Sequence, residues 1–90
     1  MEYTLTLRVV NESDLSSTLR FLPDDEEVDT CLQSIEGELN ALECLTGVKR
    51  EGALFYLNSS PNCDIEKLRR EVQPILVGSV AEIVRFVSFE

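Results

Sequence analysis

The chain has 90 residues, with 17 acidic and 8 basic side chains, no histidine and a formal net charge of -9 at pH 7. This length is typical of one domain, and we interpret residues 1–90 as a single α+β domain. The negative charge argues against direct nucleic-acid binding, which requires clustered Lys and Arg, and against adsorption to anionic lipid. The field of such a protein attracts basic partners instead.

The sequence contains no apolar run long enough to span a membrane and no signal-peptide pattern at its N-terminus, so we expect a cytoplasmic protein. The three cysteines, Cys31, Cys44 and Cys63, are odd in number and widely spaced. This arrangement implies no disulfide framework. We expect each of them to be a buried or chemically idle thiol.

Residues 3–10 alternate apolar and polar side chains, which predicts a strand with one solvated face. A polar turn cluster follows at residues 11–14. Residues 15–22 alternate less regularly. They are compatible with a second strand that forms a hairpin with the first, or with an extended connection.

The most distinctive segment of the chain follows this connection. Asp24 is a candidate N-cap, and Glu27 stands three residues later, which is the spacing of a capping box. We expect one amphipathic helix over positions 24–43, with Gly37 as its weakest position and Gly47 as its stop. Its single apolar stripe consists of Val28, Leu32, Ile35, Leu39 and Leu42.

Positions 21–48 contain no Lys or Arg, but they contain eight carboxylates, namely Asp24, Asp25, Glu26, Glu27, Asp29, Glu36, Glu38 and Glu43. An exposed helix usually mixes charges of both signs, because residues three or four apart then form ion pairs. We therefore expect the helix to present an acidic face to a basic protein surface; a solvated face without a partner is the alternative. The candidate partner-binding residues are Glu26, Asp29, Glu36 and Glu43.

The second half of the chain predicts strands on either side of another helix. A turn signal at residues 50–52 precedes a strand over 53–57, and a shorter strand can precede the turn. The second helix has one apolar face, and Pro74 bends or ends it. Residues 80–89 are rich in β-branched and aromatic side chains and predict the last strand. Because apolar residues fall on both of its faces, we place this strand in the centre of the sheet.

The resulting order, β-α-β-β-α-β, predicts a ferredoxin-like two-layer sandwich, in which two helices cover one face of an antiparallel sheet. The alternative order is ββαβαβ, which applies if residues 15–22 form a true strand.

The run from Cys31 to Gly37 resembles part of the first helix of heavy-metal-associated domains, which are copper carriers of ferredoxin-like fold. In that family the second metal-binding cysteine opens such a run, and Val48 after Gly47 echoes a Gly-Val pair that follows it. Val28, however, occupies the position of the first metal-binding cysteine, so a two-thiolate site at that loop is excluded. The resemblance therefore implies a shared way of packing a helix on a sheet, without metal carriage.

The sequence gives little support to catalysis. No histidine is available to activate a cysteine, and the chain has no glycine-rich phosphate loop and no nucleophile-elbow motif. The acidic run at residues 24–27 lacks the spacing of a calcium loop. Lys67, Arg69 and Arg70 alternate with glutamates, so we expect a salt-bridged, solvated face there. We expect no cofactor and no metal.

These observations favour a non-enzymatic interaction module, such as a small inhibitor or accessory protein that presents an acidic helix to a basic partner. The alternative is a homodimeric regulatory domain of ferredoxin-like fold that binds a small ligand at the subunit interface. An enzyme that uses carboxylates alone as general acid and base is a third hypothesis.

Overall fold

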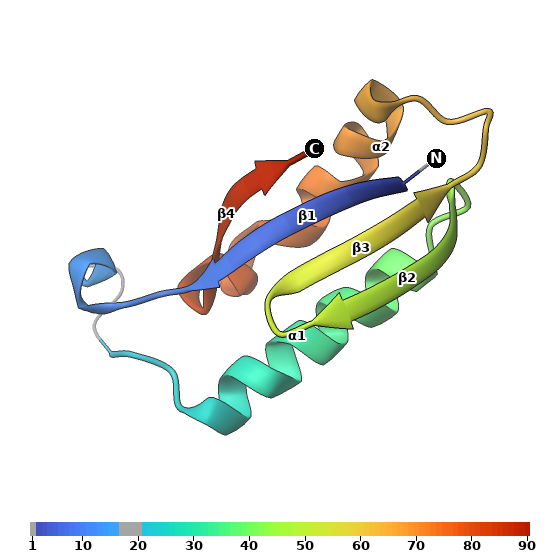
Figure 1. The fold of residues 1–90 in the computed structure, drawn as a ribbon. Helices are drawn as coiled ribbons and strands as arrows, with labels where there is room; N and C mark the ends of the chain where they lie inside the picture. The colour runs from blue at the N-terminus through green and yellow to red at the C-terminus, as the bar shows by residue number, and fades with distance from the viewer. Residues whose placement is uncertain (1, 17–20) are drawn as a thin grey trace.

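The structure, a computed structural model, describes residues 2–16 and 21–90, without the side chain of Ser79. Within these residues, four strands form one antiparallel sheet, and two helices lie behind it in Figure 1. The strands are β1 (Glu2–Val9), β2 (Leu45–Glu51), β3 (Leu54–Ser59) and β4 (Val84–Phe89), in the spatial order β2-β3-β1-β4. The helices are α1 (Asp25–Asn40) and α2 (Ile65–Val72), and the short 3-10 helices are η1 (Glu12–Asp14), η2 (Gln73–Leu76) and η3 (Gly78–Glu82). The element order β-α-β-β-α-β and the α+β class therefore agree with the sequence prediction.

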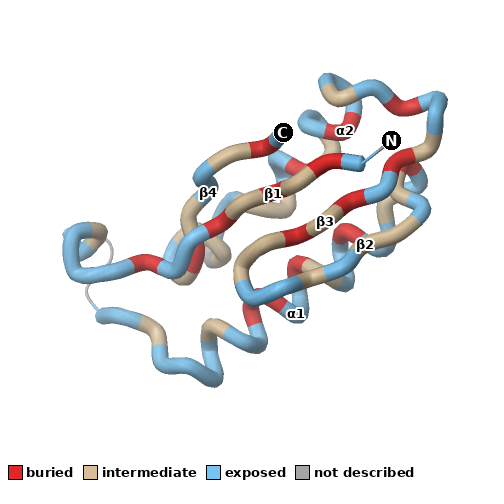
Figure 2. Tube along the Cα trace, in the orientation of Figure 1, coloured by how far each residue is buried: buried red, intermediate tan, exposed pale blue. Residues whose placement is uncertain are grey.

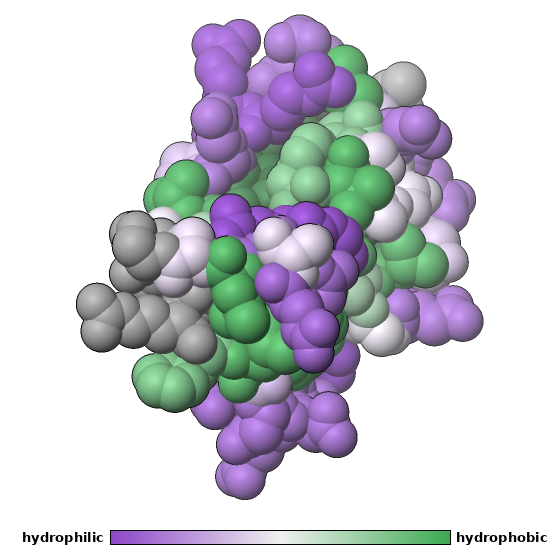
Figure 3. All heavy atoms as spheres, turned by 90° about the vertical axis from the view of Figure 1, so that its left-hand side faces the viewer, coloured by the Kyte–Doolittle hydropathy of each residue, from purple (hydrophilic) through white to green (hydrophobic). Residues whose placement is uncertain are grey.

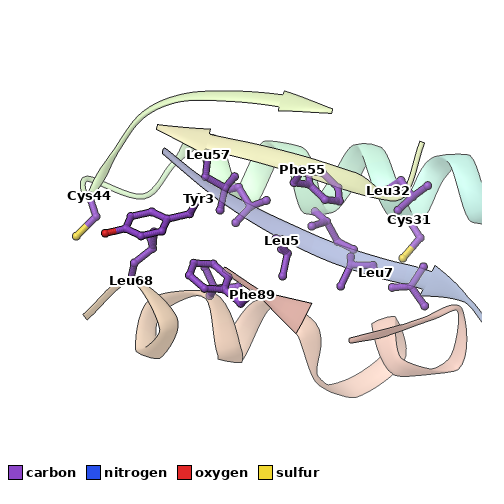
Figure 4. Close-up of a cluster of buried hydrophobic side chains, with 14 of the residues drawn as sticks. Tyr3, Leu5, Leu7, Cys31, Leu32, Cys44, Phe55, Leu57, Leu68 and Phe89 are labelled. Atoms are coloured by element: carbon purple, nitrogen blue, oxygen red, sulfur yellow. The ribbon is translucent and has the colours of Figure 1, made fainter. Parts of the chain in front are cut away.

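β1 lies between β3 and β4 and shows the alternation that predicts it. Tyr3, Leu5 and Leu7 are buried in the core with residues of both helices, whereas Thr4 and Thr6 between them are half-buried. Figure 2 shows this alternation of burial along β1. The buried side chains of β1 and β3 meet those of both helices in one core (Figure 4). The largest fully buried members of this core are Phe55, Leu5, Ile35, Leu39, Leu57 and Leu68.

α1 begins where the capping box predicts its start. The Asp24 carboxylate accepts a hydrogen bond from the Glu27 N–H at 2.8 Å, and the Glu27 carboxylate accepts one from the Asp24 N–H at 3.5 Å. Together they satisfy two of the N–H groups that a helix start leaves unpaired. The apolar stripe faces the sheet, with Cys31, Leu32, Ile35 and Leu39 buried.

The prediction of a helix over positions 24–43 is wrong at its C-terminal end, because α1 ends at Asn40. The chain has to reverse between Ala41 and Cys44 in order to enter β2 at Leu45. Leu42 remains packed against the core, although it lies beyond the helix. Gly47 is not the helix stop: it lies inside β2, opposite Asn58 of β3.

β4 lies at an edge of the sheet, and the prediction of a central strand is therefore wrong. It begins at Val84, because the preceding residues form η3 after Gly78, whose φ of 76° lies in the left-handed region. Although β4 has apolar residues on both of its faces, it is not buried on both of them. Phe86 and Val87 are 56% and 50% exposed, next to an irregularity in the pairing of β4 with β1.

The alternative order ββαβαβ gains no support from the described part of the chain. Residues 15, 16, 21 and 22 are not in a strand, and residues 17–20 of this hypothesis lie outside the described residues.

Candidate functional site

The acidic side chains at the start of α1 are exposed to solvent. Asp24, Asp25, Glu26 and Glu27 are all exposed, and none of the ion pairs between described residues involves them. Figure 3 views this end of the molecule and shows hydrophilic groups at its lower margin, where α1 begins, with hydrophobic atoms above them. The start of the helix is thus an acidic surface without a described internal counterion.

Unlike the carboxylates at the start of α1, Asp29 and Glu36 each have a cationic neighbour, Arg50 of β2. Its Nη2 lies 3.7 Å from Asp29 Oδ1, and its Nε lies 3.4 Å from Glu36 Oε1. Gln33 also donates a hydrogen bond to Asp29 at 2.8 Å. These two candidate residues therefore belong to a contact between α1 and β2, and they are partly neutralised.

Glu26 and Glu43 complete the predicted set, and the structure does not bring the four residues onto one helix face. Glu43 lies in the turn beyond the end of α1 and is exposed. Glu26 lines a cavity of about 420 Å³ between α1 and η3, whose lining includes neither Asp29 nor Glu36. The cavity has a carboxylate rim and partly apolar walls, lined by Asp24, Glu26, Glu27, Thr30, Cys31, Ser34, Val80 and Ile83.

The expectation of three idle thiols is wrong for Cys44 and Cys63, which form a disulfide with Cα atoms 5.7 Å apart. The bond joins the turn before β2 to the loop before α2. Their separation of 19 residues gave no signal in the sequence, because folding alone brings the two segments together. Cys31 is free and buried, as predicted, and burial raises the pKa of its thiol.

A charge cluster that the sequence did not predict lies just after the C-terminal end of β1, between this strand and η1. Arg8 donates two hydrogen bonds to the Asp14 carboxylate, at 2.7 and 2.9 Å, and the Asn11 N–H donates a third at 2.8 Å. These hydrogen bonds and the nearby Arg85 hold the pKa of Asp14 well below its usual range. The cluster fixes η1 against β1. Since the Asp14 carboxylate is already occupied by these donors, we assign it a structural role.

The basic cluster of α2 is close to an apolar cavity that the sequence did not predict. Arg69 lies over the ring of Phe89, with its guanidinium carbon 5.9 Å from the ring centroid, and reaches Glu66 at 4.0 Å. It also borders a cavity of about 380 Å³, which is lined otherwise by Val72, Gln73, Leu76, Val77, Phe86 and Phe89. The sequence shows only that this part of the chain is rich in apolar residues, and it does not indicate that they line a cavity.

Within residues 2–16 and 21–90, no group of three or more His, Cys, Asp or Glu side chains is arranged to hold a metal ion. Over the same residues, none of the helices has the length and apolar character needed to cross a membrane.

Comparison with protein-family models, with curated proteins and with solved structures finds no match to this chain.

Proposed function

We propose that this chain is a non-enzymatic interaction module, such as a small inhibitor or accessory protein, which docks on a basic protein surface through the start of α1. The observation that carries the proposal is the run Asp24, Asp25, Glu26 and Glu27, which is exposed and has no cation in contact among the described residues. The helix dipole places only about half a positive charge at this end of the helix. Four carboxylates therefore leave it strongly negative.

Among the four residues selected from the sequence, this proposal gives Glu26 the central role. Asp29 and Glu36 are already engaged by Arg50, so that a partner would have to compete with an internal cation. Glu43 stands apart, in the turn after the helix. The docking surface is thus smaller than the full cation-free segment, and it adjoins the cavity lined by Glu26 and Glu27.

The test is a capture experiment from native extract, followed by titration with the captured protein. Asp25→Lys combined with Glu26→Lys reverses two exposed charges at the start of α1 without removing the capping pair, and we expect it to abolish binding. Glu2→Lys combined with Glu51→Lys changes the net charge equally at exposed positions elsewhere, and it should bind like the unmodified chain. Binding should weaken as salt rises. Equal loss in both variants would mean that only overall charge matters, and equal retention would remove the docking role.

A second candidate function is a homodimeric regulatory domain that binds a small ligand. The cavity of about 380 Å³ beside β4 favours it, because it is largely apolar with Arg69 and Gln73 at its margin. Such a composition is typical of small-molecule sites. A ligand of this site should raise the melting temperature, and it should lose that effect in a Leu76→Glu variant that still folds.

We also propose that the fold is a ferredoxin-like sandwich. The order of elements, the exclusively antiparallel pairing of the described strands and their arrangement β4-β1-β3-β2 support this assignment. A cytoplasmic location receives no such support, since a disulfide such as Cys44–Cys63 is more typical of oxidising compartments.

A further inference from the structure

β4 is an edge strand of the sheet. It pairs with β1 on one side, and no described strand lies on its other side. Natural edge strands are commonly guarded by charged side chains, proline, a β-bulge or a covering loop, and β4 has the bulge and one charged side chain, Arg85. β4 contains neither Lys nor Pro, and its neighbourhood exposes large apolar side chains, with Val77 60% exposed in addition to Phe86 and Val87.

The pairing of β4 with β1 determines which of its backbone groups point outward. Thr4 and Glu90 exchange two hydrogen bonds, at 2.7 and 3.0 Å, and the Val10 N–H donates to the Ile83 carbonyl at 3.0 Å. Because hydrogen-bonded and non-hydrogen-bonded pairs alternate along an antiparallel ladder, the backbone groups of Phe86 and Phe89 point away from β1. They are therefore available to another strand.

The irregularity in the pairing of β4 with β1 brings Phe86 and Phe89 opposite alternate residues of β1. Phe89 stands opposite Leu5 and Phe86 opposite Leu7, so three steps of β4 cover two steps of β1. This is the geometry of a β-bulge with Val87 as the extra residue. Both phenylalanines consequently lie on the helix side of the sheet, and both border the cavity between β4 and η2. Along the strand they are as far apart as residues i and i+2 of a regular strand.

We propose that a second copy of this chain adds its own β4 to this edge in antiparallel orientation, with Phe86 of each copy opposite Phe89 of the other. A two-fold axis between the strands makes both contacts equivalent, as an isologous interface requires. In this register the outward backbone groups of the two copies face one another. The bulge occurs in both strands, so their spacings match.

The same register is complementary in charge. It places Arg85 of each copy opposite Glu90 of the other, on the open face of the joint sheet. The cross-strand neighbour of Arg85 on β1 is Arg8, which carries a like charge. Asp14, the acidic group near both arginines, is engaged by Arg8 through two hydrogen bonds, so Glu90 of the other copy would give Arg85 a carboxylate of its own. In addition, the Arg85 Nε is buried without an acceptor in the described part of the chain, whereas Glu90 is exposed. A slip of one residue would place Phe86 against Ser88 and Arg85 against Phe89, which loses both matches.

Sedimentation velocity of the full chain over a range of concentrations tests the proposal. We expect a reversible dimer, and we expect Phe86→Lys to shift it to monomer at every concentration. Phe21→Lys is the matched control: Phe21 is also a highly exposed phenylalanine, but it lies far from β4 in sequence and outside any strand. It should dimerise normally. Circular dichroism verifies that each variant remains folded.

Charge reversal tests the register. Arg85→Glu and Glu90→Arg should each weaken dimerisation about tenfold or more, as expected for truncated or reversed charge pairs, and the double variant should restore it. A chain that is monomeric throughout overturns the proposal. So does equal loss in Phe86→Lys and Phe21→Lys, or a double variant no better than the single ones. The proposal does not depend on docking at the start of α1, and the Asp25 and Glu26 variants should dimerise unchanged.

Discussion

Arg50 of β2 lies between two carboxylates of α1, with its guanidinium within 4.0 Å of both Asp29 and Glu36. It is the only cation in the described residues that forms an ion pair with this helix. Arg50 follows the cation-free segment 21–48 in the sequence, and folding brings it back to the middle of α1. Asp29 and Glu36 are thereby partly neutralised, whereas the carboxylates at the start of the helix have no such partner among the described residues. This contact therefore determines which acidic residues remain available to a partner.

Replacing Arg50 by Gln should lower the free energy of unfolding by up to about 1 kcal/mol, since both ion pairs are partly exposed and such pairs are individually weak. Urea denaturation at low and high salt measures the loss, which should shrink as salt screens the interaction. Lys49→Gln removes a charge from the adjacent exposed position and should have a smaller effect. An equal loss in both variants would show that Arg50 has no special role.

Gly37 offers a stabilising substitution. It lies inside α1, and apart from its two chain neighbours and the adjacent helix backbone no atom of the chain lies within 4 Å of the place where a Cβ would be added. Gly37→Ala should therefore raise the free energy of unfolding by roughly 0.5–1 kcal/mol, because glycine loses more backbone entropy in a helix than alanine does. Gly52→Ala is the contrasting variant: Gly52 has a φ of 61° in the turn between β2 and β3, and alanine is strained there. Thermal denaturation should move in opposite directions for the two variants.

Features that depend on neighbours in the sequence could be predicted. The capping pair Asp24 and Glu27 marks the start of α1, and the spacing of the apolar stripe identifies its buried face. The alternation of residues 3–10 identifies β1. In each case the interacting groups lie within a few residues of one another, and the pattern in the sequence reflects the geometry directly.

Features that depend on the fold could not be predicted in the same way. Arg50 reaches Glu36 across 14 residues, and Cys44 reaches Cys63 across 19. The composition of β4 suits a buried strand, yet its position at the edge follows from the order in which all the strands pair. The contact of Asp29 and Glu36 with Arg50 could not be predicted for the same reason, since this cation comes from another element.

The Asp14 carboxylate should give part of the acid sensitivity of the protein. Its pKa in the folded state lies below its value of about 3.9 in an unfolded chain. A depressed folded-state pKa stabilises the protein above the unfolded pKa, and this contribution is lost as the pH falls toward the folded pKa. Asp14→Asn should therefore reduce stability near neutral pH and flatten its decline below about pH 4.

Urea denaturation at a series of pH values provides the measurement for Asp14. Glu12→Gln, at an exposed neighbouring position in η1, serves as the control and should keep the acid-dependent slope of the unmodified chain. If Asp14→Asn shows the same slope as the control, the ion pair with Arg8 does not contribute to the pH dependence.

The Cys44–Cys63 disulfide should be a major contributor to stability, because it closes a loop of 19 residues that contains the β2–β3 hairpin. A crosslink over a loop of this size restricts the unfolded chain, and it typically contributes about 3 kcal/mol. In a domain this small, that is a large fraction of a total stability of roughly 5–10 kcal/mol. A reducing agent should therefore lower the midpoint of urea denaturation markedly.

The double variant Cys44→Ser and Cys63→Ser should match the reduced chain and should not respond to the reducing agent. Cys31→Ser, which leaves the disulfide intact, should retain the full response. A reduced chain with an unchanged midpoint, after a thiol count that shows three free cysteines, would contradict the prediction.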